Sequence, residues 1–506
     1  MNRLLPRLVV IVTAVVMHAC TTLGPDYTEP DVDWLNEWET DLYGQAQPGT
    51  SGEDDLRFWW QAFNDTTLND LVEIARKENP SLRIAGLRIA ESRALLGIAT
   101  GSQYPQVQQA TGAVGRVDSW PTEGSNSGDH SDFTSYNLGF NLGWELDFWG
   151  RYQRGIESAD AAFFSSITNQ QNAQVLLSAQ VVQTYFAYRT TQAQIEIAQM
   201  NADLQKRSLE ITQRLYNSGQ DSELDLQQAR TQYLATTATI PNLEISLHQF
   251  SNALSVLLGR PPGEMPELVA QAGELPILDP EMIQSIPANL LMRRPDIRTS
   301  AWQVAAQSAQ IGVAEADLYP SVSLFGTIGW SGNTLDGSTD TASLGFGPGL
   351  TWNLFNYGRL ENNVRIQDAR LQQAIESYQN TVLQASREID DAAISVVKTR
   401  EQGAILAQAE ESARRALKLS SARYREGYSD FQRVLDAQRA LAAQSTNYVA
   451  NQGAHLSAVV AFYKALGGGW QTVSVDELIP LDTRQVMEER TDWGDLLQAP
   501  LPEPGQ

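Results

Sequence analysis

Apolar and polar residues alternate strictly over residues 136–148. The even positions are leucine or aromatic, and the odd positions from 137 to 147 are Gly, Asn, Glu or Asp. A weaker alternation recurs over 322–330 and 344–354. A period of two places successive side chains on opposite faces of a strand. With polar loops at 118–132 and 331–341, the pattern predicts two pairs of long strands, at about 105–149 and 320–356.

Long strands with one apolar face, aromatic ends and polar loops are typical of a transmembrane β-barrel. A soluble hairpin packed on helices also alternates, but the strand length and the aromatic content favour the barrel. A sheet in hydrocarbon must close, because unpaired backbone groups there are costly. Four strands cannot close alone, since single-chain barrels use about eight or more. We therefore predict assembly, and a trimer would supply twelve strands around a pore.

Two long segments lack helix breakers and predict helices. No Gly or Pro lies between Gly155 and Gly219, and sixty-odd helical residues reach roughly 95 Å. Residues 359–402 are also unbroken, and 404–426 continue them. Apolar side chains in the first segment follow coiled-coil spacing, with Ser208 among them: Ile197, Met200, Leu204, Ile211 and Leu215.

Each long segment is predicted to turn and return, at Gly219 in the first half and Gly427 in the second. Pro241 should break the returning helix of the first half, where the second half has Val449. Beside membrane strands these helices would extend the pore into the periplasm. The alternative is a structural coiled coil with no channel.

The chain repeats itself, and each copy runs helix, two strands and long helices. Matching residues are 215 positions apart before the strands and 208 apart after them: Pro80 and Pro295, Arg83 and Arg298, Gly97 and Gly312, Trp144 and Trp352, Gly150 and Gly358, Tyr216 and Tyr424, Gly219 and Gly427, and Leu258 and Leu466. We assign copies to 65–262 and 288–470, with a breaker-rich linker at 263–287. Residues 471–506 form a C-terminal tail.

The first residues resemble a bacterial lipoprotein signal. Arg3 and Arg7 precede an apolar run too short to span a bilayer, and the only cysteine, Cys20, follows at the expected cut. A lone cysteine cannot form an internal disulfide. The resemblance implies removal of 1–19 and acylation of Cys20, which then begins an acylated segment, 20–64. His18 and Met17 depart from the usual pattern, so an ordinary signal peptide with a free Cys20 is the alternative.

Composition argues against several classes of function. There are 36 Lys and Arg against 60 Asp and Glu, a net charge of −24. Such acidity disfavours nucleic acid as a partner. Four histidines and one cysteine supply little for a metal or redox site. No phosphate loop, nucleophile elbow or His-Glu-x-x-His is present. We predict no enzyme and no cofactor beyond the lipid on Cys20.

Motifs across nearly the whole chain resemble the TolC/OprM outer-membrane factor family, in its lipoprotein, NodT-like branch. The motifs are Cys20–Tyr27, Phe58-Trp59-Trp60 with Phe63, Arg293-Arg294-Pro295-Asp296-Ile297, and Tyr424-x-x-Gly427 leading into Val434–Arg439. Ser300-Ala301 departs from the usual Ala-Glu.

The resemblance implies an α+β membrane protein that assembles as a homotrimer. It would form a twelve-stranded barrel in the outer membrane, four strands per chain, continued by a periplasmic α-helical barrel that is closed at its tip. Such a channel is the passive exit duct of a tripartite efflux pump, with a periplasmic adaptor and an inner-membrane transporter of the RND type. A type I secretion exit, with the same fold, and a non-channel envelope scaffold are the alternatives.

The resemblance also implies a periplasmic gate. Asp436 falls where the family has an aspartate ring, and three carboxylates at a threefold axis would favour cations. The alternative is a solvated surface acid. Arg433 falls where some relatives have a second acidic ring. Its equivalent in the first copy is Asp225, and we hypothesise that the two pair near the tip, where Tyr424 also lies.

The two predicted turns are the expected adaptor contacts: Tyr216, Gly219, Tyr424 and Gly427. Glycines that supply a positive φ are the simpler explanation, and both can hold.

Overall fold

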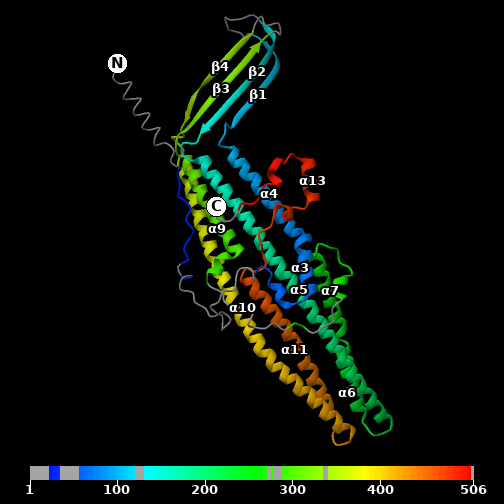
Figure 1. Cartoon of the computed structure of the whole chain (residues 1–506). Coiled ribbons are helices and arrows are strands. Elements are labelled where there is room, and N and C mark those ends of the chain that lie inside the picture. The colour runs from blue at the N-terminus through cyan, green and yellow to red at the C-terminus, as the bar shows by residue number, and fades with distance from the viewer. Residues whose placement is uncertain are drawn as a thin grey trace. The chain divides into compact units, whose positions relative to one another are not determined.

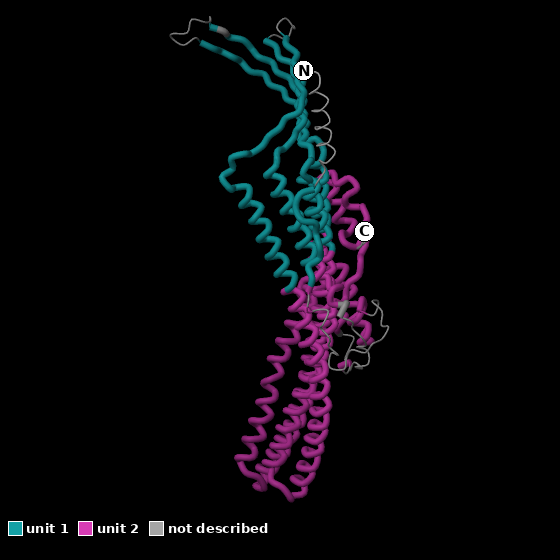
Figure 2. The backbone as a smooth tube through the Cα atoms, turned by 90° about the vertical axis from the view of Figure 1, so that its left-hand side faces the viewer, with its two compact units in different colours: residues 1–31, 89–167, 299–379 teal, residues 32–88, 168–298, 380–506 magenta. Residues whose placement is uncertain are grey.

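The computed structural model describes residues 22–32, 34, 56–120, 130–269, 275–276, 288–333 and 340–502. Cys20 and the predicted signal peptide lie outside the described residues, as does most of the breaker-rich part of the linker. The chain forms two compact units, coloured separately in Figure 2. Unit 1 takes its residues from 1–31, 89–167 and 299–379, and unit 2 from 32–88, 168–298 and 380–506. Each sequence copy contributes to both units.

Unit 1 contains a four-stranded antiparallel sheet (Figure 1). Its strands, in spatial order, are β1 (Val107–Ser119), β2 (Ser131–Leu146), β3 (Ser321–Gly332) and β4 (Thr341–Thr351). The two predicted strand pairs are present, and β2 pairs with β3 to join the two copies. The strands end earlier than the alternation suggested, since Phe148 and Leu354 lie past them.

The register gathers most of the large apolar residues on one face of the sheet, while Phe325 lies on the other. Phe140 lies opposite Ile328, which lies opposite Leu344. One row further, Gly326 separates Leu142 from Phe346, so large side chains have glycine between them. The other face is mostly Gly, Ser, Thr and Asn. Within the single chain the apolar face is uncovered, and Phe346 is 81% exposed.

Tryptophans bind backbone carbonyls at one end of the strands, where β1 and β3 begin and β2 and β4 end. The indole of Trp144 donates to Gln103 O at 3.0 Å, and that of Trp352 donates to Leu318 O at 3.0 Å. Trp149 donates to Pro320 O at 2.8 Å. Such a ring of aromatic residues is typical of a membrane interface.

Helices of equal length in the two copies confirm the duplication. Their bounds are α4 (Pro80–Gly101) and α9 (Pro295–Ala316) before the strands, and α5 (Arg151–Asn217) and α10 (Arg359–Arg425) after them. Both α5 and α10 have 67 residues, and they start 208 positions apart. The absence of Gly and Pro over most of α5 is what permits one unbroken helix.

The returning helices in unit 2 are α6 (Glu223–Thr237) and α7 (Ile240–Leu257) in the first copy and α11 (Phe431–Ala465) in the second. The predicted break at Pro241 is confirmed, because α7 starts with proline in its first turn. The second copy, with Val449, has one continuous helix. Shorter elements complete the described chain: η3 (Trp59–Phe63), α3 (Thr66–Glu78), α8 (Pro266–Val269), η5 (Ala288–Arg293), α12 (Val475–Leu478), α13 (Leu481–Arg490) and η6 (Gly494–Leu497).

Aromatic residues pack the core of unit 2. Trp59 stacks on Tyr463 with ring centroids 5.0 Å apart, and Phe63 meets Phe186 at 4.6 Å. Beside them is a buried polar group. Asp65 caps α3 by accepting from Leu68 N, and its other oxygen accepts from the Tyr185 hydroxyl at 2.6 Å.

Candidate functional site

The two helix hairpins of unit 2 end in turns of the same geometry. Gly219 has a φ of +73° and Gly427 a φ of +79°, values that favour glycine. Each glycine N–H donates to the carbonyl of the tyrosine three residues earlier, Tyr216 at 2.9 Å and Tyr424 at 3.0 Å. A Cβ on either glycine would meet nothing within 4 Å, so the backbone angle accounts for both. The predicted turns are therefore present.

A hydrogen bond joins the two turns. The Tyr424 hydroxyl, at the end of α10, donates to Asp221 Oδ2 in the first turn at 2.6 Å. The Tyr424 ring packs against Phe431 at 5.4 Å. Burial raises the pKa of Tyr424, and the hydrogen bond to Asp221 raises it further. The phenol therefore stays protonated and able to donate at neutral pH.

Sequence reasoning singled out Tyr424 but missed Asp221. Its equivalent in the second copy is Ser429, so the repeat provides no matching acid. The other tyrosine of the pair, Tyr216, is 38% exposed. The available signal was this difference between equivalent positions, an acid at 221 and a serine at 429.

Further contacts tie the second hairpin to the first. Gln438 of α11 donates to Ser208 Oγ of α5 at 2.6 Å, and Arg439 donates to Gln232 of α6 at 2.9 Å. A shared apolar cluster lies beside them, with members on α5, α6, α10 and α11: Leu209, Ala229, Ala413, Leu417, Tyr424, Phe431, Val434, Leu435, Ala437 and Leu441. The two hairpin ends thus form one packed group.

Asp436 lies on the exposed side of α11, away from this cluster, with a side chain that is 61% exposed. It accepts from Gln432 Nε2 at 3.0 Å, and Arg439 Nη1 lies 3.7 Å away. A single chain therefore leaves the carboxylate available to solvent or to another chain.

The structure does not bring Asp225 and Arg433 together within one chain. Arg433 Nε lies 3.9 Å from Asp430, which caps α11. Asp225 accepts from Ser222 Oγ at 2.7 Å, and Ser222 caps α6. Each residue of the hypothesised pair thus has a local partner at its own helix start.

The predicted coiled-coil seam lines an open groove of about 1040 Å³ between α5, α10 and α11. Ile197, Met200, Leu204 and Ile211 contribute its apolar wall, and Met200 is 59% exposed. Arg207, Arg414 and Lys418 also line it. A groove with an apolar wall and charged edges can accept the apolar side of another helix.

Neither a metal cluster nor a membrane-spanning helix occurs among the described residues. They contain no group of three or more His, Cys, Asp or Glu that could hold a metal ion. None of their helices is long and apolar enough to cross a membrane.

Comparison with known proteins identifies the family of this chain. The family model described as outer membrane efflux protein matches residues 71–260 and 286–468. The chain belongs to the outer membrane efflux protein family. The family is one of outer-membrane channels, so the predicted family, location and efflux function are confirmed.

Individual relatives match almost end to end. The pyoverdine export outer membrane protein OpmQ of Pseudomonas putida is 31% identical over 477 residues, 93% of this chain and 99% of its own. "Probable outer membrane lipoprotein SilC" of Salmonella typhimurium is 27% identical over 473 residues, 92% of this chain and 99% of its own. The solved outer-membrane channel OprN superposes with a TM-score of 0.80 at 32% identity, covering 89% of this chain and all of that one. The predicted fold class, a trimeric barrel with four strands per chain and a long α-helical barrel, is that of these channels.

Proposed function

We propose that three copies of this chain form the exit duct of a tripartite efflux pump and conduct small molecules or ions passively from the periplasm to the exterior. The observation that carries this proposal is the four-stranded sheet. Its apolar face is uncovered, and within the chain its outer strands β1 and β4 each pair on one side only. In hydrocarbon such edges must be paired. Three sheets edge to edge give twelve strands with the Gly and Ser face lining a pore.

The energy for transport comes, in this proposal, from an inner-membrane transporter of the RND type, reached through a periplasmic adaptor. The groove between α5, α10 and α11 and the two hairpin turns support the adaptor contact. Its apolar wall suits a helix, and charged side chains of both signs at its edge suit polar contacts with that helix. Tyr424, which begins the second turn, lines this groove, and Tyr216 begins the first turn.

The chain is held in the outer membrane, in this proposal, by acyl chains on Cys20 as well as by its strands. The support is a lone cysteine directly after a secretory signal. An acyl chain adds about 0.8 kcal/mol of membrane affinity per buried methylene, so several chains make a durable tether. No other covalent group or cofactor is proposed.

The gate lies, in this proposal, at the hairpin ends. The Tyr424–Asp221 bond and the shared apolar cluster hold the hairpins together. Asp436, exposed on α11, would face its two copies across the threefold axis, where mutual repulsion and a narrow passage favour cations. Asp225 and Arg433, which have local partners within the chain, would contact each other only across neighbouring chains.

Single-channel conductance in planar bilayers tests this function. Wild-type trimers should show a low, cation-selective conductance, and Asp436→Ala should raise it or remove its selectivity. Glu411→Ala, an exposed acid on α10, controls for charge loss alone. Conductance that Asp436→Ala leaves unchanged would discard the gate residue. No conductance from folded trimers of either form would refute the channel.

A further inference from the structure

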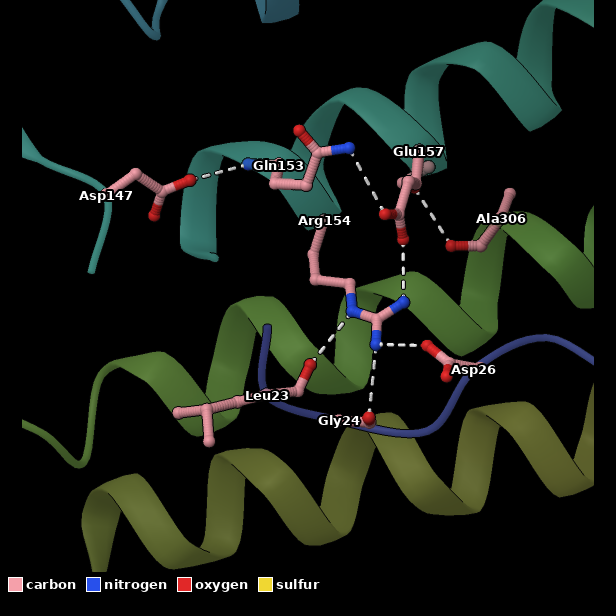
Figure 3. Close-up of polar contacts among 9 residues, drawn as sticks. Leu23, Gly24, Asp26, Asp147, Gln153, Arg154, Glu157 and Ala306 are labelled. Atoms are coloured by element: carbon pink, nitrogen blue, oxygen red, sulfur yellow. Dashed lines mark hydrogen bonds and ion pairs between the residues drawn. The ribbon is translucent and has the colours of Figure 1, made fainter. Parts of the chain in front are cut away.

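Residues 22–26, which we call the N-terminal strap, lie against the first turn of α5 and against α9 in unit 1 (Figure 3). Arg154 of α5 binds the strap three times. Its Nε donates to Leu23 O at 2.9 Å, and its Nη2 donates to Gly24 O at 3.2 Å. The same Nη2 donates to Asp26 Oδ1 at 2.7 Å. The Arg154 side chain is only 5% exposed.

Glu157 binds the remaining nitrogen of the Arg154 guanidinium. Arg154 Nη1 donates to Glu157 Oε2 at 2.7 Å, one turn further along α5. Arginine suits this site because its planar fork presents several donors in fixed directions, whereas lysine presents one compact charge. A buried arginine that binds two successive carbonyls and a carboxylate recognises an extended backbone with an acid at a set position.

Two glycines let the strap approach closely. A Cβ on Gly312 of α9 would lie 2.4 Å from Leu23 O, and a Cβ on Gly150 would lie 2.6 Å from Thr22 Cγ2. Both distances are too short for any side chain. Leu23 N also donates to Trp149 O at 3.1 Å. The backbone atoms of the strap are thus contacted from two sides.

The duplication supplies an internal comparison. The equivalent of Gly312 is Gly97, where a Cβ would meet nothing within 4 Å. The equivalent of Arg154 is Asn362. The second copy folds its long helix without the arginine, and the first copy folds its short helix without needing the glycine. The repeated fold therefore does not explain Arg154, whereas the strap does. Both copies have glycine at the other position, but only at Gly312 does a backbone carbonyl of the strap occupy the space of a Cβ.

We propose that Arg154 and Gly312 form a docking site for residues 22–26 of the exported chain, which fixes the chain two residues after the acylated Cys20. The acylation itself rests on the function proposed above. Cys20 precedes Thr22 by two residues, a reach of about 7 Å at most. Trp149, bonded to the strap, lies three residues past β2 and packs on Tyr319 with centroids 4.7 Å apart. The acyl chains therefore enter the bilayer at this aromatic level and not from a freely moving tether.

Hydrogen exchange of the peptide that contains Leu23, measured on purified trimers, tests the docking site. Arg154→Gln and Gly312→Ala should each speed exchange of the Leu23 amide at least about tenfold, since bonds from a charged donor are lost or blocked. Gly97→Ala, the same change at the equivalent open position, should exchange like wild type. Wild-type exchange in both Arg154→Gln and Gly312→Ala would overturn the proposal, as would loss of protection in Gly97→Ala.

Two further variants separate the docking site from the fold and from the lipid. Asp26→Asn changes a side chain that is 91% exposed, so it weakens docking without disturbing the helices, and exchange should rise severalfold. A Cys20→Ser chain exported by an ordinary signal peptide carries no lipid and should keep wild-type protection. Loss of protection in that chain would show that the lipid holds the strap, and would overturn the proposal. An unmodified intact mass of the wild type would instead refute the acyl anchor, while the exchange rates still decide the docking site.

Discussion

Replacing Tyr424 with phenylalanine should open the channel at the hairpin ends. The change removes one hydroxyl, the donor to Asp221 at 2.6 Å, and keeps the ring that packs on Phe431. The apolar cluster is preserved, so the expected effect is that of the hydrogen bond alone.

The magnitude follows from the charge and exposure of the pair. A hydrogen bond to a charged group contributes about 1.5–3 kcal/mol. Both residues are half-buried, so water can replace part of the bond, and the lower value applies. A loss of about 1.5 kcal/mol shifts the closed-to-open equilibrium of one chain about tenfold. If three chains open together, the losses combine to about 4.5 kcal/mol, roughly a thousandfold.

Single-channel recording at fixed voltage measures the open probability directly. Tyr216→Phe is the matched control, because it makes the same change at the equivalent position of the first hairpin, where the tyrosine is exposed. Tyr424→Phe should raise the open probability by at least about tenfold. Tyr216→Phe should not alter it.

An open probability unchanged in Tyr424→Phe, from trimers of normal stability, would refute the reasoning that this bond helps hold the hairpins closed. An equal increase in Tyr216→Phe would also refute it, because the effect would then belong to the turns in general.

Three other outcomes are expected. Because the pKa of Tyr424 is raised, its hydrogen bond to Asp221 is intact below the ordinary tyrosine pKa of about 10 and is lost only as pH rises through the raised value. The conductance should therefore be constant from about pH 7 to 9. A rise in conductance within that window would contradict the assignment. Leu344→Arg places a charge on the apolar face and should cost up to about 2–4 kcal/mol, measured as loss of heat-stable trimer, whereas Ser343→Arg on the opposite face should be tolerated. Arg189→Met leaves the Asp65 carboxylate, which is 8% exposed, without its cation. The free energy of unfolding, measured by thermal unfolding, should fall by about 3–5 kcal/mol. A smaller loss of stability than Tyr185→Phe causes would contradict this prediction.

Most of the fold could be predicted from local periodicity in the sequence. Alternation over 136–148 depends only on neighbouring residues, so it predicted β2 and the face that its apolar residues share. The ends of the strands were less certain, because Trp352 continues the alternation but its indole binds Leu318 O past the end of β4. Helix length and the turns at Gly219 and Gly427 also follow from local chemistry, namely where Gly and Pro are absent and where a positive φ is needed.

Pairings between distant residues required the tertiary structure. The repeat shows that Tyr216 and Tyr424 are equivalent, yet only Tyr424 meets Asp221, because the packing of one hairpin against the other is asymmetric. Gly97 and Gly312 also match in sequence, and only the position of the strap distinguishes them. The elements, their repetition and the need for assembly were thus predictable from the residues alone. Which of two equivalent residues acquires a contact was decided by long-range packing, which has no periodic signal.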